Sequence, residues 1–533
     1  NGLYGISSMT DRQLYADALV NINKRFGDDW TFQANIGASI SDMSYDAMKN
    51  RGPIADGLIT EEKPGLANVF NIQNLSNSPK TTRLQEGWRE QTQSVFGSAE
   101  VGFKGTYYLT LTARNDWPSQ LAGPHSNRKS FFYPSVGLSV VLSEIIPNMP
   151  ENLEYIKLRG SYASVGTAFE RYIANPMYQW NASGLSWNTQ TQYPMYDLKP
   201  ELTNSFEVGL TVRFLKWFNL DATYYHTNTL NQTFNPQIST GSGSSEIYIQ
   251  SGDVLNQGCE FTLGFNKDWN KFNWSSTYTF STNMNRIESL AENVLNAATG
   301  EYFSVDLLDM NGLGLAHFLL MEGGTLGDLY SLADYKYDSN GMIVVNEDGT
   351  ITPQTITDAK NYVKLGSVLP KANMSWRNDF RIGDFNFGFL ITARLGGIVY
   401  SSTQAVLDYY GVSEASAAAR DAGGVFINGG DCIDANKWFS SVGGSNPLPQ
   451  EYTYSGTNVR LQEASIGYTI PRKKLGDVCD LHLSLVGRNL WMIYNKAPFD
   501  PEAVATTGNY YQGIDHFMMP SLRNFGFNVR VTF

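Results

Sequence analysis

The last nine residues, Phe525–Phe533, have the sequence Phe-Gly-Phe-Asn-Val-Arg-Val-Thr-Phe. In an extended strand the side chains point alternately to the two faces, so every second residue shares a face. Here one face is entirely apolar and rich in phenylalanine, whereas the other carries Gly526, Asn528, Arg530 and Thr532. A strand of a soluble β-sandwich can also alternate. A strand that ends the chain on an aromatic residue is typical of the closing strand of a transmembrane β-barrel, and the rest of the sequence tests this prediction.

The composition allows two classes of β protein and excludes several others. Aromatic residues make up 13% of the 533 residues, and charged residues only 17%, against about 25% in an average soluble domain. The longest apolar run, around Leu313–Met321, is far shorter than the roughly 18 residues of a membrane helix. The net charge of −12 argues against a nucleic-acid partner, which requires a basic face. A secreted β protein and a membrane β-barrel remain.

Candidate strands recur along the whole chain. Most of them are close to the roughly 9–11 residues with which a tilted strand crosses a bilayer, longer than the average strand of a globular protein. Alternation is clear in Phe385–Leu395, where Phe385, Phe387 and Phe389 oppose Asn386 and Gly388. We expect fifteen strands, near Tyr15–Asn23, Trp30–Ser41, Thr92–Phe103, Tyr107–Asn115, Phe132–Leu142, Tyr155–Val165, Ser205–Phe214, Phe218–Thr227, Val254–Asn266, Phe272–Thr282, Ala372–Phe380, Phe385–Leu395, Val459–Thr469, Asp480–Asn489 and Phe525–Phe533.

The lengths of the connections favour the membrane barrel. Counted back from Phe533, long and short connections alternate: Thr469 to Asp480 is short, Leu395 to Val459 is long, and Phe380 to Phe385 is a tight turn. Outer-membrane barrels have short periplasmic turns and long extracellular loops. By this parity Asn1–Leu14 is expected in an extracellular loop. Because an odd number of antiparallel strands cannot close a barrel, and open edges are costly in lipid, we predict that residues 1–533 are the C-terminal portion of one larger barrel.

Several blocks of sequence, from Leu111 to Phe533, resemble one family in the family's order. They are Leu111–Trp117 (LTARNDW), Phe132–Glu144 (FYPSVGLSVVLSE), Ile156–Gly166 (IKLRGSYASVG), Leu198–Gly209 (LKPELTNSFEVG), Glu322–Tyr330 (EGGTLGDLY), Leu365–Asn378 (LGSVLPKANMSWRN), Thr403–Val425 (TQAVLDYYGVSEASAAARDAGGV), Val486–Trp491 (VGRNLW) and Pro520–Phe533 (PSLRNFGFNVRVTF). The chain is similar in these blocks to the SusC-like (RagA-like) TonB-dependent outer-membrane transporters. This resemblance implies an all-β fold, about the last 15 strands of a 22-stranded barrel, whose N-terminal plug, TonB box and first strands lie outside the chain.

The resemblance also implies the function and the partners. We expect TonB-dependent import of oligomeric nutrients, oligosaccharides or oligopeptides, across the outer membrane of a Gram-negative bacterium of the Bacteroidota type. The implied partners are a SusD-like surface lipoprotein as a lid, TonB-ExbB-ExbD acting through the absent N-terminal region, the lipid bilayer, and a second transporter–lid pair in a dimer. The alternative is a passive channel or a surface adhesin built on a barrel.

No enzymatic constellation or cofactor motif is found. The five histidines show no metal-ligand spacing. Ser126 near His125, and Asp515 beside His516, are the only pairs that fit a rim hydrolase, and we do not favour that hypothesis. Asp338–Gly341 and Asn346–Gly349 suit hairpin turns better than calcium loops, although a structural calcium ion in other loops or in the lid protein stays open. The odd set Cys259, Cys432 and Cys479 favours free thiols over a Cys432–Cys479 disulfide.

Two groups of residues are candidates for contact with the transported molecule. Arginines recur at the inward phase of the strands, and Glu100, Glu207 and Asp221 share that face, so ion pairs along the lumen wall are expected. The lumen-lining candidates are Arg114, Arg159, Arg213, Arg394, Arg488 and Arg530. Loop aromatics suit stacking on sugars or contact with extended peptides, and equally loop packing or lid contact. The substrate-binding candidates are Tyr178, Trp180, Trp187, Tyr193, Tyr510 and Tyr511. The Ala-rich segment Ser401–Ala422 is expected to form a short extracellular helix.

Overall fold

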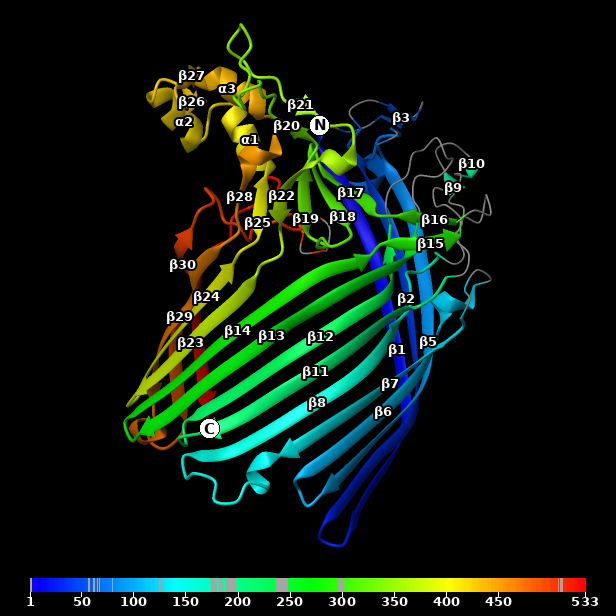
Figure 1. The fold of residues 1–533 in the computed structure, drawn as a ribbon, viewed down its shortest axis with the longest axis vertical. Helices are drawn as coiled ribbons and strands as arrows, with labels where there is room; N and C mark the ends of the chain where they lie inside the picture. The colour runs from blue at the N-terminus through cyan, green and yellow to red at the C-terminus, as the bar shows by residue number, and fades with distance from the viewer. Residues whose placement is uncertain are drawn as a thin grey trace.

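One curved antiparallel sheet makes up most of the molecule (Figure 1). The computed structural model describes the chain except residues 1, 56–57, 61–62, 65, 67, 79, 124–125, 127, 174–179, 182–185, 188–197, 236–247, 296–301, 507 and 509–510. In this described part the sheet has 15 strands in chain order. They are β1 (Leu3–Phe26), β2 (Trp30–Pro53), β5 (Thr82–Phe103), β6 (Tyr107–Pro118), β7 (Phe131–Val141), β8 (Leu153–Thr167), β11 (Glu201–Phe214), β12 (Phe218–Phe234), β13 (Ile249–Trp269), β14 (Phe272–Ser289), β23 (Ala372–Ile382), β24 (Phe385–Leu395), β29 (Asn458–Ile470), β30 (Asp480–Asn495) and β32 (Asn524–Thr532).

The predicted strand number and up-and-down order are confirmed, but three strands are much longer than expected. β1 and β2 have 24 residues each and β5 has 22, about 70–80 Å of extended chain. The prediction that Asn1–Leu14 lies in a loop was wrong, because the residues from Leu3 onward pair with β2, beginning with Leu3 opposite Pro53. Beyond the bilayer both faces of a strand meet water, so the alternation that marks a strand in the sequence fades while the backbone ladder continues.

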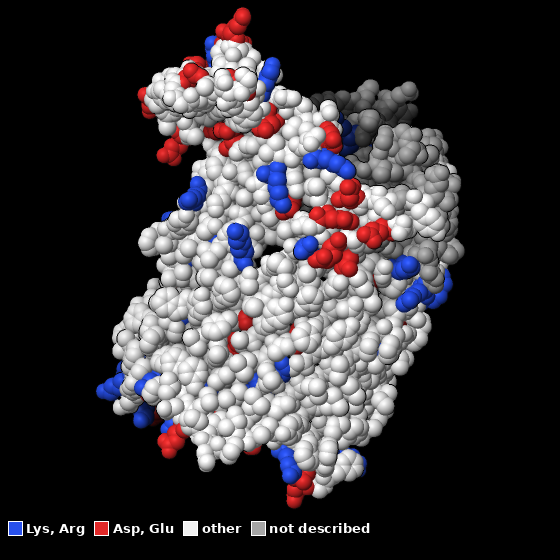
Figure 2. All heavy atoms as spheres, viewed as in Figure 1, with Lys and Arg blue, Asp and Glu red and all other residues white. Residues whose placement is uncertain are grey.

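The sheet has an apolar outer face and a polar inner face. On the outer face Leu138 is 59% exposed and Leu485 57% exposed. Figure 2 shows that charged side chains gather over the upper part of the molecule and along its lower rim, with few on the sheet between them. A soluble protein rarely exposes so large an apolar surface. The apolar outer surface between the two charged regions is the lipid-facing surface of a barrel.

Aromatic side chains gather beside the short turns at the lower end of the sheet. Ring centroids lie 4.5 Å apart for Trp30 and Phe103 and 4.7 Å apart for Phe385 and Tyr468. Trp269 stacks on Phe272 at 5.4 Å across the β13–β14 turn. Tyrosine and tryptophan prefer the boundary between hydrocarbon and headgroups, where their polar atoms reach water. These rings therefore mark the bilayer boundary at the turn end.

The long connections at the other end fold into a body that we call the cap (residues 290–295, 302–370 and 396–457, with residues 511–517). It contains a sheet of β17 (Leu307–Leu313), β18 (Ala316–Met321), β19 (Asp328–Ser331) and β22 (Val363–Ser367), and a second sheet of β28 (Thr453–Ser455), β25 (Ile398–Ser401) and β31 (Ile514–Asp515). The helices α1 (Ser402–Tyr409), α2 (Glu414–Asp421) and α3 (Ala435–Val442) cover it. The expected single helix in Ser401–Ala422 is therefore two helices, and α3 was not predicted.

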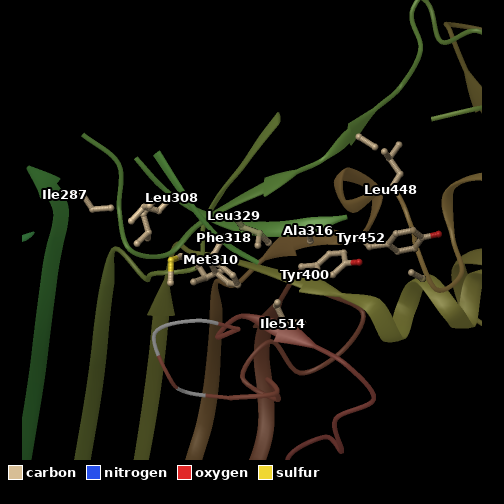
Figure 3. Packing of buried hydrophobic residues seen from close by; sticks show 14 of the residues in the cluster. Ile287, Leu308, Met310, Ala316, Phe318, Leu329, Tyr400, Leu448, Tyr452 and Ile514 are labelled. Carbon is tan, nitrogen blue, oxygen red and sulfur yellow. The ribbon is translucent and has the colours of Figure 1, made fainter. Parts of the chain in front are cut away.

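A continuous apolar core holds the cap together and joins it to the ends of β12, β13 and β14, since Phe234, Val254 and Ile287 belong to the same core (Figure 3). Phe318 and Leu329 of the first sheet, Tyr400 of the second and Ile514 of the last loop are all buried in it.

The predicted turns at Gly341 and Gly349 are confirmed, since both glycines have positive φ and are flanked by the bridges Tyr337–Ile343 and Val345–Ile351. All three cysteines are free. Within the described residues, no helix combines the length and apolar character needed to cross a membrane.

Candidate functional site: the polar wall and the cap

The strand register shows where the candidate arginines lie. Residues directly opposed in a ladder share a face, as do residues two apart. Arg114 of β6 opposes Tyr133 of β7, Ser135 of β7 opposes Ala163 of β8, and the same face continues strand by strand to β32. By this register the arginines that share the face are Arg114, Arg159, Arg213, Arg394, Arg488 and Arg530. That this face lines a transport path stays a prediction.

A first cluster on this face joins β5, β6 and β7. The Arg114 Nε atom lies 2.7 Å from Asp116 Oδ1, and its Nη2 donates to Ser94 Oγ at 2.8 Å. The Tyr133 hydroxyl donates to the other oxygen of Asp116 at 2.6 Å. Charge-assisted bonds of this length are the stronger kind. They fix the guanidinium against the wall.

A second cluster joins β8, β11 and β12 around Arg159. Its guanidinium pairs with Asp221 at 2.9 Å and donates to Thr223 Oγ1 at 2.6 Å and Thr211 Oγ1 at 3.0 Å. Gly209 opposes Arg159 in the ladder. A Cβ atom at residue 209 would lie 2.3 Å from Arg159 Nε, so glycine is required there for the guanidinium to cross the strand and reach Asp221.

A third cluster contains residues that the sequence analysis missed. Arg377 of β23 pairs with Asp379 at 2.8 Å and approaches Glu463 of β29 at 3.8 Å. Glu463 also pairs with Arg488 at 3.0 Å. The alternation in β23 could have revealed Arg377, since it falls on the same phase as Asn373 and Ser375.

The remaining three candidate arginines have different neighbours. The guanidinium of Arg213 lies 5.2 Å from the ring centroid of Tyr155. Arg394 donates to the carbonyl oxygen of Val368 at 2.8 Å, which ties the wall to the cap. Arg530 opposes His482 in the ladder of β30 and β32.

Paired charges make this wall hydrophilic without a strong net charge. The Arg159 and Asp221 side chains are 38% and 39% exposed, so solvent screens them and each pair contributes little to stability. In the part of the chain that the structure describes, no group of three or more His, Cys, Asp and Glu side chains could hold a metal ion.

The last long loop is fastened to the cap at the N-terminus of α1. Tyr400 of β25 pairs in parallel with Ile514, and Ser401, the N-cap of α1, donates to Asp515 Oδ2 at 2.6 Å. The backbone N–H of Phe517 donates to Thr403 Oγ1 at 2.6 Å. The Asp515 carboxylate thus bonds to a helix cap, which does not support the hydrolase hypothesis for Asp515 and His516. His125 lies outside the described residues.

The six candidate binding aromatics are only partly placed by the structure. Tyr178, Tyr193 and Tyr510 lie outside the described residues. Trp180 belongs to β9 (Trp180–Asn181) and opposes Trp187 of β10 (Ser186–Trp187), and Trp187 is 64% exposed. Tyr511 makes an edge contact with the buried Phe318 at 6.5 Å between ring centroids. This contact favours loop packing for Tyr511, whereas substrate contact by the others stays a prediction.

An antiparallel sheet with an apolar outer face, a polar inner face and short turns at one end defines a transmembrane β-barrel protein. The model of the "TonB dependent receptor-like, beta-barrel" family matches residues 2–373, more than half of the chain. The chain therefore belongs to the TonB-dependent receptor β-barrel family of the outer membrane.

Relatives and solved structures agree with this assignment. TonB-dependent receptor P3 of Formosa agariphila is 23% identical over 545 residues, covering 94% of this chain and 51% of that protein. TonB-dependent receptor P26 of the same organism is 25% identical, covering 90% and 50%. The structure of the RagAB peptide transporter matches with a TM-score of 0.76 at 15% identity, over 99% of this chain and 56% of that one. The chain spans about half the length of the curated relatives that it matches.

Proposed function

We propose that this chain is the C-terminal barrel portion of a TonB-dependent importer that moves oligomeric nutrients, oligosaccharides or oligopeptides, inward across the outer membrane. The observation that carries the proposal is the continuous polar face of paired charges on the inside of a lipid-facing barrel. Residues on this face, including the six arginines, would line the path when the plug rearranges. The energy would come from TonB-ExbB-ExbD acting on an N-terminal plug that is not part of this chain.

A SusD-like surface lipoprotein is the proposed partner at the cap. Structures titled as the RagAB peptide importer in "open-open" and "closed-closed" states share this fold, with TM-scores of 0.75 and 0.74. On the cap, Tyr410 and Val412 beside α1 and α2 are 71% and 69% exposed, and aromatic and aliphatic anchors of this kind favour a protein interface. A dimer of transporter–lid pairs in a Bacteroidota-type bacterium is the proposed assembly.

Uptake in cells separates an active importer from a passive channel or an adhesin. The measurement is uptake of labelled oligosaccharides and oligopeptides by cells that carry the full-length gene, with and without tonB. We expect uptake that needs both the gene and tonB. Uptake that continues without tonB would support a passive channel, and cell attachment without uptake would support an adhesin.

A further inference from the structure

A pocket on the polar face of β5 lies outside the bilayer, where an incoming molecule would first meet the wall. Trp88 and Glu90 share a face with Ser94, which bonds to Arg114 of the polar wall. Trp88 is about 15 residues above Phe103 at the turn end, or about 50 Å along the strand. With a tilt of about 40° this rises well beyond the roughly 25 Å apolar band of a barrel. The pocket has a volume of about 530 Å³ and is lined by Trp88, Glu90, Gln120, Glu170, Arg171 and Tyr172.

A small apolar core positions the pocket walls. Leu121, Phe131, Phe169, Ile173 and Leu198 are all buried together beside β7. Phe169 and Ile173 anchor the segment after β8 in this core, so the residues between them are presented to the pocket. Leu121 is buried in the same core and so holds its neighbour Gln120 at the pocket. The pocket is therefore held by packing and is preformed in this conformation.

Two of the hydrogen-bond donors of the pocket are used internally. The Glu90 carboxylate accepts from Arg171 Nη1 at 2.7 Å and from Gln120 Nε2 at 3.0 Å. The Arg171 guanidinium also lies 3.8 Å from the ring centroid of Trp88. By contrast, the buried Gln120 Oε1 atom has no hydrogen-bond partner among the described residues. A buried acceptor without a partner is costly, so the pocket is complementary to a ligand that donates hydrogen bonds.

Tyr172 is held in an unfavourable backbone conformation at the edge of this pocket. Its φ of 69° lies in the left-handed region, which costs a bulky residue about 1–2 kcal/mol. Its side chain is 41% exposed, so the ring does not compensate by filling the apolar core. Strain at an exposed aromatic residue is typical of a binding site, where it presets the ring for a ligand.

We propose that this pocket binds a neutral sugar ring of an oligosaccharide substrate, an inference that rests on the proposed import function. A sugar offers hydroxyl donors to Gln120 Oε1 and the carboxylates, and an apolar C–H face to the Tyr172 ring. Glu90, Glu170 and Arg171 give the pocket a net negative charge, which disfavours uronates and sulfated sugars. Arg171 already occupies a face of Trp88, which disfavours a lysine or arginine side chain of a peptide at that ring.

The test uses the full-length transporter purified with its natural partner, and two substitutions at one residue. Tyr172→Gly removes the ring but suits the positive φ, so the protein should be at least as stable as the wild type. Tyr172→Phe keeps the ring. The probes are neutral maltohexaose, laminarihexaose, mannohexaose and xylohexaose, acidic hexagalacturonate, and hexapeptides of alanine and of lysine, measured by calorimetry and native mass spectrometry. Tyr302→Ala is the matched control, because Tyr302 is an exposed tyrosine on another loop (68%).

We expect at least one neutral hexasaccharide to bind, with a loss of at least tenfold in affinity for Tyr172→Gly and less than threefold for Tyr172→Phe and Tyr302→Ala. Binding of none of the neutral sugars, preference for hexagalacturonate or a peptide, or unchanged affinity in Tyr172→Gly would overturn the proposal. These outcomes are independent of tonB. Sugar binding that depends on Tyr172 without tonB-dependent uptake would refute the import function alone, whereas tonB-dependent uptake of peptides would refute only the sugar site.

Discussion

The barrel wall and the cap are stabilised in different ways. The wall is a single layer whose apolar side chains, such as Leu138 and Leu485, remain exposed, so its free energy depends on the backbone ladder and on lipid. In the cap the apolar side chains are buried against one another, and Phe318, Leu319 and Leu320 are fully buried. The wall therefore needs a membrane to be stable, whereas the cap has the core of a small soluble domain. Substitutions in the cap and in the wall should therefore affect the stability of the two regions separately.

The largest effect is expected in the cap core. Phe318→Ala removes a fully buried ring and leaves a cavity, which should lower the free energy of unfolding of the cap by about 3–5 kcal/mol. The membrane-spanning part of the barrel should be unaffected. Limited proteolysis of the cap in folded protein, together with the heat-resistant electrophoretic mobility of the barrel, measures the two regions separately.

Phe206→Ala is the matched control for this substitution, because Phe206 lies on the outer face of β11 and is 47% exposed. Its loss should leave the protease sensitivity of the cap unchanged. A Phe318→Ala protein whose barrel unfolds together with its cap would show that the two regions form one cooperative unit and contradict the comparison.

The next largest effect is expected in the wall, where the cost of a new charge depends on whether its face meets lipid. Leu485 of β30 lies between Ile466 of β29 and Phe527 of β32 on the outer face. Leu485→Arg should cost the barrel about 2–4 kcal/mol if it lies near the middle of the bilayer. Ser484→Arg points to the polar face beside Gly467 and Asn528 and should be far milder. Urea unfolding in lipid vesicles measures both, and equal effects would mean that the face assignment is wrong.

The sequence predicted the wall far better than the cap, for a physical reason. Alternation is a local signal, and for this reason the expected strand Phe385–Leu395 agrees with β24. The run Leu313–Met321 was recognised only as apolar, whereas its residues Ala316–Met321 form β18 between β17 and β19, and Phe318 is covered by the distant Tyr511. The same holds for the proposed sugar pocket. Glu90 and Arg171 are far apart in the chain and share no motif, and only the folded sheet brings them to 2.7 Å.

A smaller effect is expected where the last loop joins the wall, and it should depend on pH. Asp500 pairs with the nearly buried Arg460 at 2.9 Å. Burial raises the pKa of Asp500, but the hydrogen bonds from Ser521 and Arg460 outweigh it and the pKa lies below its ordinary value. Because its pKa is lowered in the folded state, the carboxylate stabilises the fold above about pH 4. This stabilisation is lost as the pH falls through the folded-state pKa. Asp500→Asn should cost about 1.5–3 kcal/mol at pH 7, measured by proteolysis of residues 496–523, and progressively less as the pH falls through the folded-state pKa of Asp500.

Asp408 in α1 provides a control, because its pKa is shifted in the opposite direction. Burial raises the pKa of this carboxyl, although Ser413 and Gln404 hydrogen-bond to it. A raised carboxyl pKa stabilises the fold below about pH 4, and this contribution is lost as the pH rises through the folded-state value. Asp408→Asn should therefore make the cap more resistant to protease at pH 7 than the wild type. A loss of resistance would mean that the ionised carboxylate is needed by its neighbours.

The smallest effect tests one of the two cap turns that the sequence did predict. Gly341 has a φ of 78° in the turn after Asp338, and a Cβ atom there would touch nothing within 4 Å. Gly341→Ala therefore introduces only backbone strain, about 1 kcal/mol. Gly430→Ala is the matched control, because its surroundings are equally open and its φ is not positive. Hydrogen exchange of the Tyr337–Ile343 turn should rise about fivefold for Gly341→Ala and not for Gly430→Ala. Equal exchange in both would mean that the turn tolerates a side chain, and that glycine was not what determined it.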